Sequence, residues 1–237
     1  MSRASSVPVV TIDGPSGTGK GTIGSYLAKT RGWKFLDSGA LYRAFAFFAD
    51  ETGVRPDDVE GIKDLGKNNT FVFDVAESGD LQVLVNSRDV SGIVQSEESG
   101  KLASTYAAIP CVRAVLIDEQ RRQRRPPGLV ADGRDMGTIV FPDAVLKIFL
   151  TASPEIRAKR RYKQLKSKDF NVNLAQLSAL ISERDRKDMS RAVAPLAPAS
   201  DAVVIDTSDR SINDVLGEVD RLLNVYLQDS VSGIEQE

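Results

Sequence analysis

A glycine-rich segment, Asp13-Gly-Pro-Ser-Gly-Thr-Gly-Lys-Gly-Thr22, carries the strongest chemical signal in the sequence. It contains the pattern G-x-x-x-x-G-K between an apolar run and a helical pattern, which is the context that a phosphate-binding loop requires. Its glycines let backbone N–H groups point at a polyphosphate, and the lysine adds a mobile positive charge. The residues expected to cradle the polyphosphate are Gly14, Pro15, Ser16, Gly17, Thr18, Gly19, Lys20, Gly21 and Thr22.

The residue after Lys20 departs from the usual pattern of such loops. A serine or threonine normally follows the lysine and binds magnesium through its hydroxyl. Here Gly21 takes that place and the hydroxyl comes one residue later, at Thr22. The sequence therefore assigns no protein side chain as a direct magnesium ligand.

Two further segments have the composition of anion clamps. The first, Asp37–Arg43, is expected to open a helix with Ser38 as its cap, which places Arg43 one turn into the helix. The second, Asp132–Asp135, follows an apolar run, at the carboxyl edge where ligands bind in open α/β sheets. Its carboxylates could hold magnesium through water while Arg134 faces phosphate, although a charged, solvated turn would have the same composition.

A helix is predicted from about Leu174. Its core-facing stripe runs through Leu174, Leu177 and Ile181 and continues, at helical spacing, as Arg184, Asp188 and Arg191. Charged groups on a buried face need partners. A bound nucleotide would supply them, with phosphate for the arginines and ribose hydroxyls for the carboxylate, and an internal cluster of salt bridges would supply them equally well.

A second helix with a basic face is predicted after residue 153. Ser153 is expected to cap it and Pro154 to occupy its first position. Arg157, Arg160 and Arg161 then share one face. This pattern fits a lid over residues 153–170 that closes over a phosphoryl group, and it fits a solvated basic face as well.

The fold class follows from the order of the apolar runs. Runs at residues 7–12, 128–131, 145–150 and 202–205 alternate with helical patterns, which predicts a doubly wound α/β core with a parallel sheet. Two alternating segments, residues 71–75 and 81–85, interrupt this order and are joined by a turn at residues 77–80. They predict an antiparallel hairpin within an insertion over residues 64–104.

Composition excludes several function classes. The 237 residues include 31 Lys and Arg against 33 Asp and Glu, so the chain carries no general basic field for nucleic acid or an anionic membrane. The absence of histidine excludes histidine-based triads and zinc sites, and the single Cys111 excludes an internal disulfide. No long apolar run and no secretory signal is found, so we expect a cytoplasmic protein with no nucleic-acid or membrane partner.

Several segments occur in the order in which they stand in one family of small-molecule kinases: Thr11–Thr22, Leu36–Arg43, Asp89–Gly92, Ala131–Thr138, Val140–Ala144 and Arg191–Leu196. They resemble the bacterial-type cytidylate kinases, which are P-loop nucleoside monophosphate kinases, and the resemblance extends from residue 7 to about residue 206. The resemblance implies a single P-loop kinase domain over residues 1–237, with five parallel core strands, an acceptor-binding region at 38–111 and a short lid. It also implies ATP-dependent phosphorylation of CMP or dCMP with Mg²⁺, by a chain expected to be a monomer.

The resemblance also implies roles for individual residues. Those expected to bind the acceptor are Ser38, Tyr42, Arg43, Ser104, Arg113, Asp135, Arg184 and Asp188. Those expected to serve the reacting phosphates are Lys20, Arg134, Asp135 and Arg191, and Arg157 and Arg161 of the lid are expected to contact ATP.

Two other functions stay open at this point. The chain could phosphorylate a different small acceptor, such as another nucleoside monophosphate or a hydroxy acid. It could also be a regulatory module that senses ATP without transferring phosphate. A phosphate monoester is already dianionic at neutral pH and needs no general base, which is consistent with a chain that has no histidine.

Overall fold

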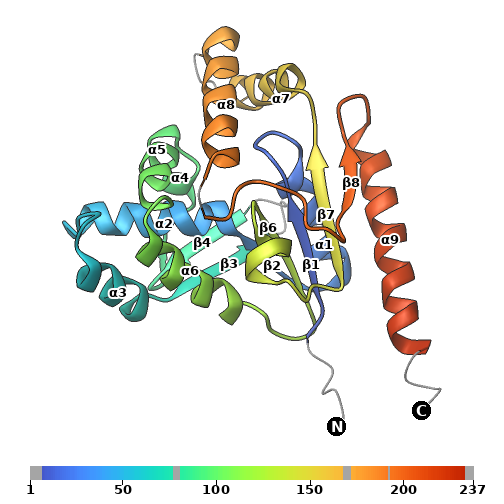
Figure 1. Ribbon diagram of the computed structural model, residues 1–237, viewed down its shortest axis with the longest axis horizontal. Helices are drawn as coiled ribbons and strands as arrows, with labels where there is room; N and C mark the ends of the chain where they lie inside the picture. Colours follow the sequence, from blue (N-terminus) through green and yellow to red (C-terminus); the bar gives the residue numbers. More distant parts are fainter. Residues whose placement is uncertain (1–6, 77–80, 168–171, 192, 233–237) are drawn as a thin grey trace. The chain divides into compact units, whose positions relative to one another are not determined.

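The structure is a computed structural model that describes residues 7–76, 81–167, 172–191 and 193–232 (Figure 1). The chain divides into two compact units. One contains Ala28–Asp132 with the segment up to Pro8, and the other contains Val9–Leu27 and Gly133–Glu237. No helix in the described part of the chain is long and apolar enough to cross a membrane.

The five predicted parallel strands are present. They are β1 (Val9–Asp13), β2 (Lys34–Asp37), β6 (Leu129–Gly133), β7 (Leu146–Thr151) and β8 (Val203–Asp206), in the order β2-β6-β1-β7-β8. Every residue of β1 is buried, as expected for a central strand covered on both faces. The four strands that were predicted from apolar runs, β1, β6, β7 and β8, end one or two residues beyond those runs, because polar residues such as Asp13 and Thr151 continue the ladder opposite Phe149 and Asp206.

The small antiparallel sheet belongs to the first unit. Its strands are β3 (Phe71–Val75), β4 (Leu81–Val85) and β5 (Arg88–Asp89). The predicted hairpin is confirmed, with Phe73 opposite Val83 and both side chains buried. Its predicted turn, residues 77–80, lies outside the described residues, and the short β5 was not predicted because two charged residues carry no strand signal.

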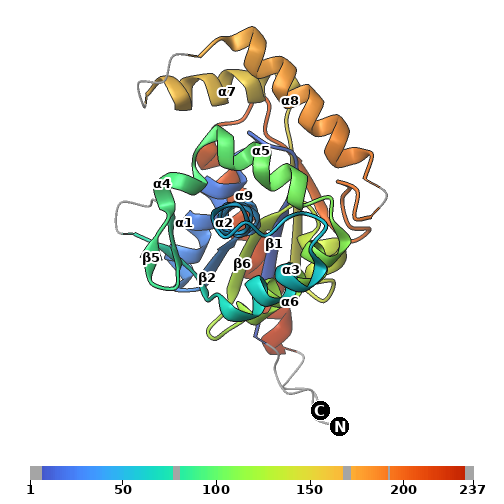
Figure 2. The same cartoon turned by 90° about the vertical axis from the view of Figure 1, so that its left-hand side faces the viewer.

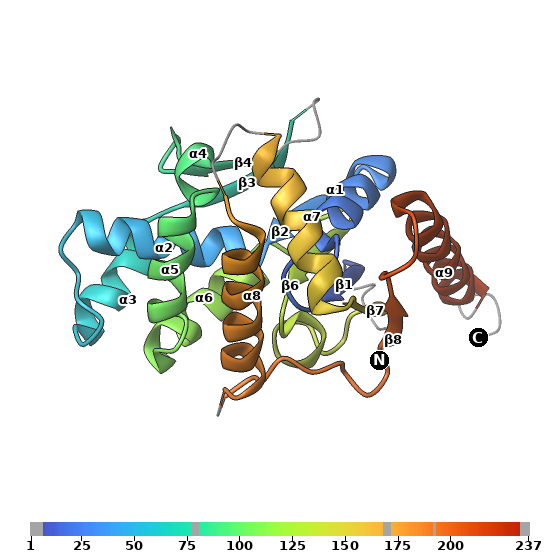
Figure 3. The same cartoon turned by 90° about the horizontal axis from the view of Figure 1, so that it is seen from above.

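Five helices occupy the rest of the first unit as described. They are α2 (Ser38–Glu51), α3 (Val59–Asn68), α4 (Ser91–Val94), α5 (Glu97–Tyr106) and α6 (Pro110–Arg122). The helix α5 crosses and contacts α2 (Figure 3). The prediction that Ser38 caps α2 is wrong: Asp37 is the cap, and its carboxylate accepts a hydrogen bond from the N–H of Ala40. A carboxylate one residue earlier reaches the same orphan amides, which leaves Ser38 as the first helical residue.

The second unit carries the helices nearest the phosphate loop. The helix α1 (Lys20–Arg31) follows the phosphate loop, and a π-helical turn, η1 (Met136–Val140), follows β6. Side by side lie α7 (Pro154–Lys166) and α8 (Leu174–Met189) (Figure 2). The last helix, α9 (Ile212–Ser232), packs beside β7, and Ser211 and Asp214 cap it reciprocally.

Two helical glycines test how tightly the helices pack. A Cβ on Gly66 of α3 would lie 2.0 Å from Cγ1 of Val115 on α6, whereas a Cβ on Gly217 of α9 would meet nothing within 4 Å. We expect Gly66→Ala to lower the free energy of unfolding by about 1–3 kcal/mol through overpacking. Gly217→Ala, the matched control, should raise it by up to about 1 kcal/mol through helix propensity. Urea unfolding followed by circular dichroism measures both, and equal effects of the two substitutions would contradict the packing.

Candidate active site

The phosphate loop joins β1 to α1 in a shape that requires glycine. Gly14 has a φ of 142°, and a Cβ there would lie 2.0 Å from the carbonyl oxygen of Leu150. Gly17 has a φ of 83°, and its Cβ would lie 3.0 Å from Cβ of Arg157. Side chains at either position would therefore collide with β7 or α7, and their absence lets the loop backbone lie directly against both elements.

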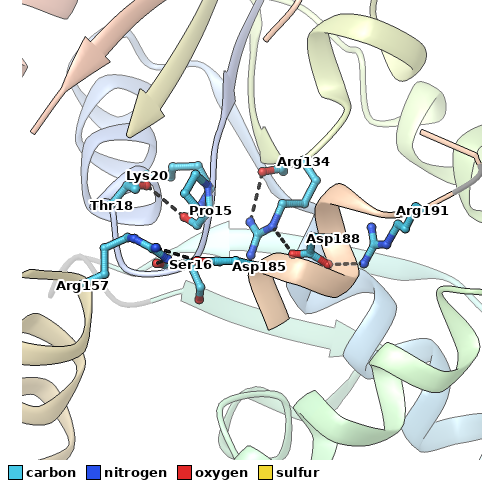
Figure 4. Close-up of polar contacts among 10 residues, drawn as sticks. Pro15, Ser16, Thr18, Lys20, Arg134, Arg157, Asp185, Asp188 and Arg191 are labelled. Carbon is cyan, nitrogen blue, oxygen red and sulfur yellow. Dashed lines mark hydrogen bonds and ion pairs between the residues drawn. The ribbon is translucent and has the colours of Figure 1, made fainter. Parts of the chain in front are cut away.

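Lys20 is buried at the first position of α1, where it closes the loop on itself. Its Nζ donates to the carbonyl oxygen of Pro15 at 2.9 Å, and the hydroxyl of Thr18 donates to the same oxygen at 3.1 Å (Figure 4). A full positive charge thus stands within a turn of backbone amides at a helix N-terminus, which is an arrangement suited to polyphosphate. Thr22, by contrast, is exposed.

The carboxylate of Asp188 on α8 bridges two arginines. Arg134 donates from Nε to Oδ2 of Asp188 at 3.0 Å, and Nη2 of Arg191 forms a short hydrogen bond with Oδ1 (Figure 4). Asp188 is 3% exposed, so this is a largely desolvated ion triad. Two of the charged residues of the predicted stripe, Asp188 and Arg191, thus bind each other, and Arg134 joins them.

Arg157 of α7 is buried against the phosphate loop. Its Nε donates to the carbonyl oxygen of Ala152 at 2.9 Å, its Nη1 to that of Ser16 at 3.2 Å, and its Nη2 to Oδ2 of Asp185 at 2.5 Å. Figure 4 shows the guanidinium of Arg157 pointing toward Ser16 and Asp185. The expected caps of α7, Ser153 with Pro154 at the first position, are both present. Arg161 is half-buried one turn further along the helix.

Asp13 closes the carboxyl end of β1 beside Lys20 and Asp135. Its two carboxylate oxygens accept hydrogen bonds from the N–H groups of Met136, at 2.9 Å, and Gly137, at 2.8 Å. Burial raises the pKa of Asp13 from 3.8 to about 6, although those two hydrogen bonds and the charge of Lys20 lower it; the negative charge of Asp135 adds to the rise. The carboxylate therefore fixes the start of η1, directly after Arg134 and Asp135.

Of the remaining predicted site residues, Arg184 is half-buried on α8 in the second unit, and the others belong to the first unit. Ser38 is buried and Tyr42 half-buried on α2, and Nη1 of Arg43 donates to the carbonyl oxygen of Val94 at 2.6 Å. Ser104 is exposed on α5, whereas Arg113 is buried on α6.

Comparison with known proteins places this geometry in one family. The profile described as cytidylate kinase matches residues 10–225. A cytidylate kinase of Methylococcus capsulatus is 54% identical over 210 residues, covering 89% of this chain and 94% of that protein. A cytidylate kinase of Stutzerimonas stutzeri is 52% identical over 214 residues, covering 90% and 93%. The chain belongs to the cytidylate kinase family.

A solved structure extends the likeness at the level of the fold alone. A crystal structure of an uncharacterized protein from Eubacterium ventriosum superimposes with a TM-score of 0.52 at 10% identity, covering 92% of this chain and 99% of that one. Because so few residues are shared, this likeness carries no information on the substrate. The sequence matches, in contrast, extend over nearly the whole chain and identify it as a kinase of the cytidylate kinase family.

The loop fits the polyphosphate that a kinase of this family uses. Glycines where a Cβ would collide, together with the buried Lys20, form a cradle for a polyanion. Within the described residues no group of three or more carboxylates and thiolates could hold a metal ion, and both oxygens of Asp13 are occupied by backbone N–H groups. The donor set therefore suits a magnesium ion that is held mainly by phosphate oxygens and water.

Three residues near the loop were missed by the sequence analysis: Asp13, Asp185 and Thr207. Asp13 directly precedes the first loop glycine at a strand end, a position that could have been recognised. Asp185 stands four residues after Ile181 on the buried face of α8, so helical spacing could have found it too. Thr207 follows β8 and has no signal in the sequence; the single hydrogen of its hydroxyl is shared between the carbonyl oxygens of Thr18, at 3.3 Å, and Thr151, at 3.1 Å.

Titration of Asp13 should be visible in the stability of the protein. Its pKa is about 6 in the folded protein against an ordinary value of 3.8, so the folded state binds the proton more tightly. Its contribution to the free energy of unfolding is therefore full below pH 4 and falls by about 3 kcal/mol as the pH rises through about 6. The measurement is the difference between the wild type and Asp13→Asn in urea unfolding from pH 4 to pH 7. A difference that does not change with pH would contradict this assignment.

Proposed function

We propose that this chain transfers the γ-phosphoryl group of ATP to CMP or dCMP, which yields ADP and CDP or dCDP. Membership of the cytidylate kinase family supports the proposal, since relatives above 50% identity over about nine-tenths of the chain carry that name. The observation that carries it is the ion triad: Asp188 draws Arg134 and Arg191 together in the unit that also contains the phosphate loop.

The proposed roles of the residues follow the two substrates. The phosphate loop, Gly14–Thr22, binds the polyphosphate of ATP. Arg157 and Arg161 of α7 belong to this ATP-binding part of the site. The acceptor is held by Ser38, Tyr42, Arg43, Ser104, Arg113, Asp135, Arg184 and Asp188. Lys20, Arg134 and Arg191, with the carboxylate of Asp135, serve the reacting phosphates.

In this reaction an oxygen of the CMP phosphate forms a new bond to the γ-phosphorus of ATP, and the bond from that phosphorus to the β–γ bridging oxygen breaks. The attacking phosphate is a dianion at neutral pH because its second pKa is about 6, so no residue has to remove a proton. The barrier comes from repulsion between two polyanions and from their misalignment. Lys20, the loop amides and the arginines lower it by offsetting charge and fixing orientation.

Magnesium belongs to this proposal through ATP. When bound, it would offset charge on the β- and γ-phosphate oxygens. The residues that could orient its water ligands are Asp132 and Asp135, which are buried beside the carboxyl end of β6.

The larger organisation inferred from the sequence is part of the same proposal. It comprises a single kinase domain over residues 1–237, an acceptor-binding region over 38–111 with its insertion at 64–104, and a lid over 153–170, of which 168–170 lie outside the described residues. The proposal also includes that the protein is a monomer in the cytoplasm, acts in pyrimidine metabolism and has no nucleic-acid or membrane partner.

A panel of acceptors separates this function from its alternatives. ADP release is measured with ATP and, in turn, CMP, dCMP, UMP, AMP and shikimate. We expect kcat/KM to be highest with CMP or dCMP. Fastest turnover with AMP or shikimate would assign another acceptor, and absence of any phosphorylated product with all of them would favour a module that only senses ATP.

Lys20→Ala tests the donor side of the site. The substitution removes the one side-chain charge within the phosphate loop, so we expect kcat with CMP to fall by on the order of 10²–10³. Lys29→Ala, on the far end of α1, is the control and should leave kcat unchanged. A Lys20→Ala enzyme with wild-type kcat would contradict the role of the loop.

Asp188→Ala tests the acceptor side. Without the carboxylate, Arg134 and Arg191 lose their common partner and repel each other, so we expect kcat/KM for CMP to fall by on the order of 10². Equilibrium binding of ATP alone should change much less. Glu183→Gln, which removes an exposed carboxylate from the same helix, serves as the control. Equal losses in CMP turnover for both substitutions would contradict the assignment.

A further inference from the structure

We propose that Arg157 and Asp185 form a positioning pair that holds the backbone of the phosphate loop in its ATP-binding shape and ties that loop to the helix carrying Asp188. The proposal rests on the function proposed above and deepens it, because it assigns Arg157 an action through the loop rather than a contact with ATP phosphate. It also assigns a role to Asp185.

The contacts of Arg157 point into the protein. All three guanidinium nitrogens donate to protein oxygens, those of Ala152, Ser16 and Asp185, and the residue is 3% exposed. A guanidinium whose three nitrogens all donate hydrogen bonds to two carbonyl oxygens and a carboxylate is fixed in orientation. Its position is also set by Gly17, whose missing side chain lets the loop lie against the Cα, Cβ and carbonyl oxygen of Arg157.

Holding the carbonyl of Ser16 has a direct effect on the next amide. A peptide unit is planar and trans, so its C=O and N–H groups point in opposite directions. Because Nη1 of Arg157 fixes the carbonyl oxygen of Ser16 toward α7, the N–H of Gly17 is turned away from α7. Arg157 thereby orients a loop amide without touching the anion that the amide would bind.

The second bond from α7 to the loop works in the same way. Nη1 of Arg160 donates to the hydroxyl of Thr207 at 2.9 Å, and the single hydrogen of that hydroxyl is shared between the carbonyl oxygens of Thr151, at 3.1 Å, and Thr18, at 3.3 Å. This shared bond restrains the carbonyl of Thr18, and the N–H of Gly19 is turned to the opposite side. The first turns of α7 therefore hold the loop at two alternate peptide units.

Asp185 links Arg157, and through it the phosphate loop, to α8. It lies three residues before Asp188, so both carboxylates are on one buried face of the helix. Oδ2 of Asp185 accepts from Arg157, whereas Oδ1 is buried with no hydrogen-bond partner in the described part of the chain. The charge of Asp185 is therefore offset chiefly by Arg157, and one helix holds both the loop, through Asp185, and the two arginines, through Asp188.

The decisive experiment measures ATP binding without acceptor, by isothermal titration calorimetry, together with the melting temperature. If the pair positions the loop, Arg157→Met and Asp185→Asn each weaken ATP binding by about tenfold or more. The double variant Arg157→Met/Asp185→Leu leaves no unpaired buried charge, so its melting temperature should recover toward the wild type. Its affinity for ATP should nevertheless stay as weak as that of the single variants.

Two outcomes would overturn the proposal. If Arg157 contacts ATP directly, Asp185→Asn frees the guanidinium and leaves ATP affinity at or above the wild-type value while Arg157→Met weakens it. If the pair only stabilises the fold, the double variant recovers ATP affinity along with its melting temperature. The exposed Glu183→Gln is the control and should match the wild type in both measurements. Failure of the proposed function would show separately, as a wild type that binds ATP and does not phosphorylate CMP.

Discussion

Repulsion between like charges is the constraint on which this site depends. Two guanidiniums, those of Arg134 and Arg191, lie on one buried carboxylate. Without Asp188 they would repel each other, and each would lose a partner that is shielded from water. In the proposed function, Asp188 holds the two cations in place for an anion before any substrate binds. Such a preorganised charge costs no rearrangement during phosphoryl transfer, which is the step in which two polyanions must approach each other.

In the further inference proposed above, the helix α8 applies the same principle to the phosphate loop. Its buried face carries Asp185 and Asp188 within a single turn, and each carboxylate binds arginine from another part of the unit. A buried carboxylate is tolerated only where a partner such as an arginine binds it. The buried face of α8, which in most helices would pack as apolar core, therefore holds two arginines in fixed positions through Asp185 and Asp188. The loop glycines serve the same end, because Gly17 allows the backbone of α7 to approach the loop closely enough for these bonds to form.

Local rules predicted much of this architecture. The G-x-x-x-x-G-K pattern predicted the position of the loop, and period-two alternation predicted the β3–β4 hairpin. Helical spacing predicted that Asp188 lies on the same face of α8 as its apolar residues. The misses have physical reasons. Asp37 rather than Ser38 caps α2 because two adjacent side chains can reach the same amides. The partners of Asp185 and Thr207 come from elements distant in the sequence, and no spacing rule states which carbonyl a buried donor will find.

The most direct test of this account is the product balance of the wild-type enzyme with ATP, Mg²⁺ and CMP as sole acceptor, followed by ³¹P NMR. Direct transfer between converged phosphates predicts that ADP and CDP form in equal amounts and that no inorganic phosphate accumulates. ADP formed together with inorganic phosphate, or no change in ATP when CMP is added, would contradict the claim that these cations bring two nucleotides together for phosphoryl transfer.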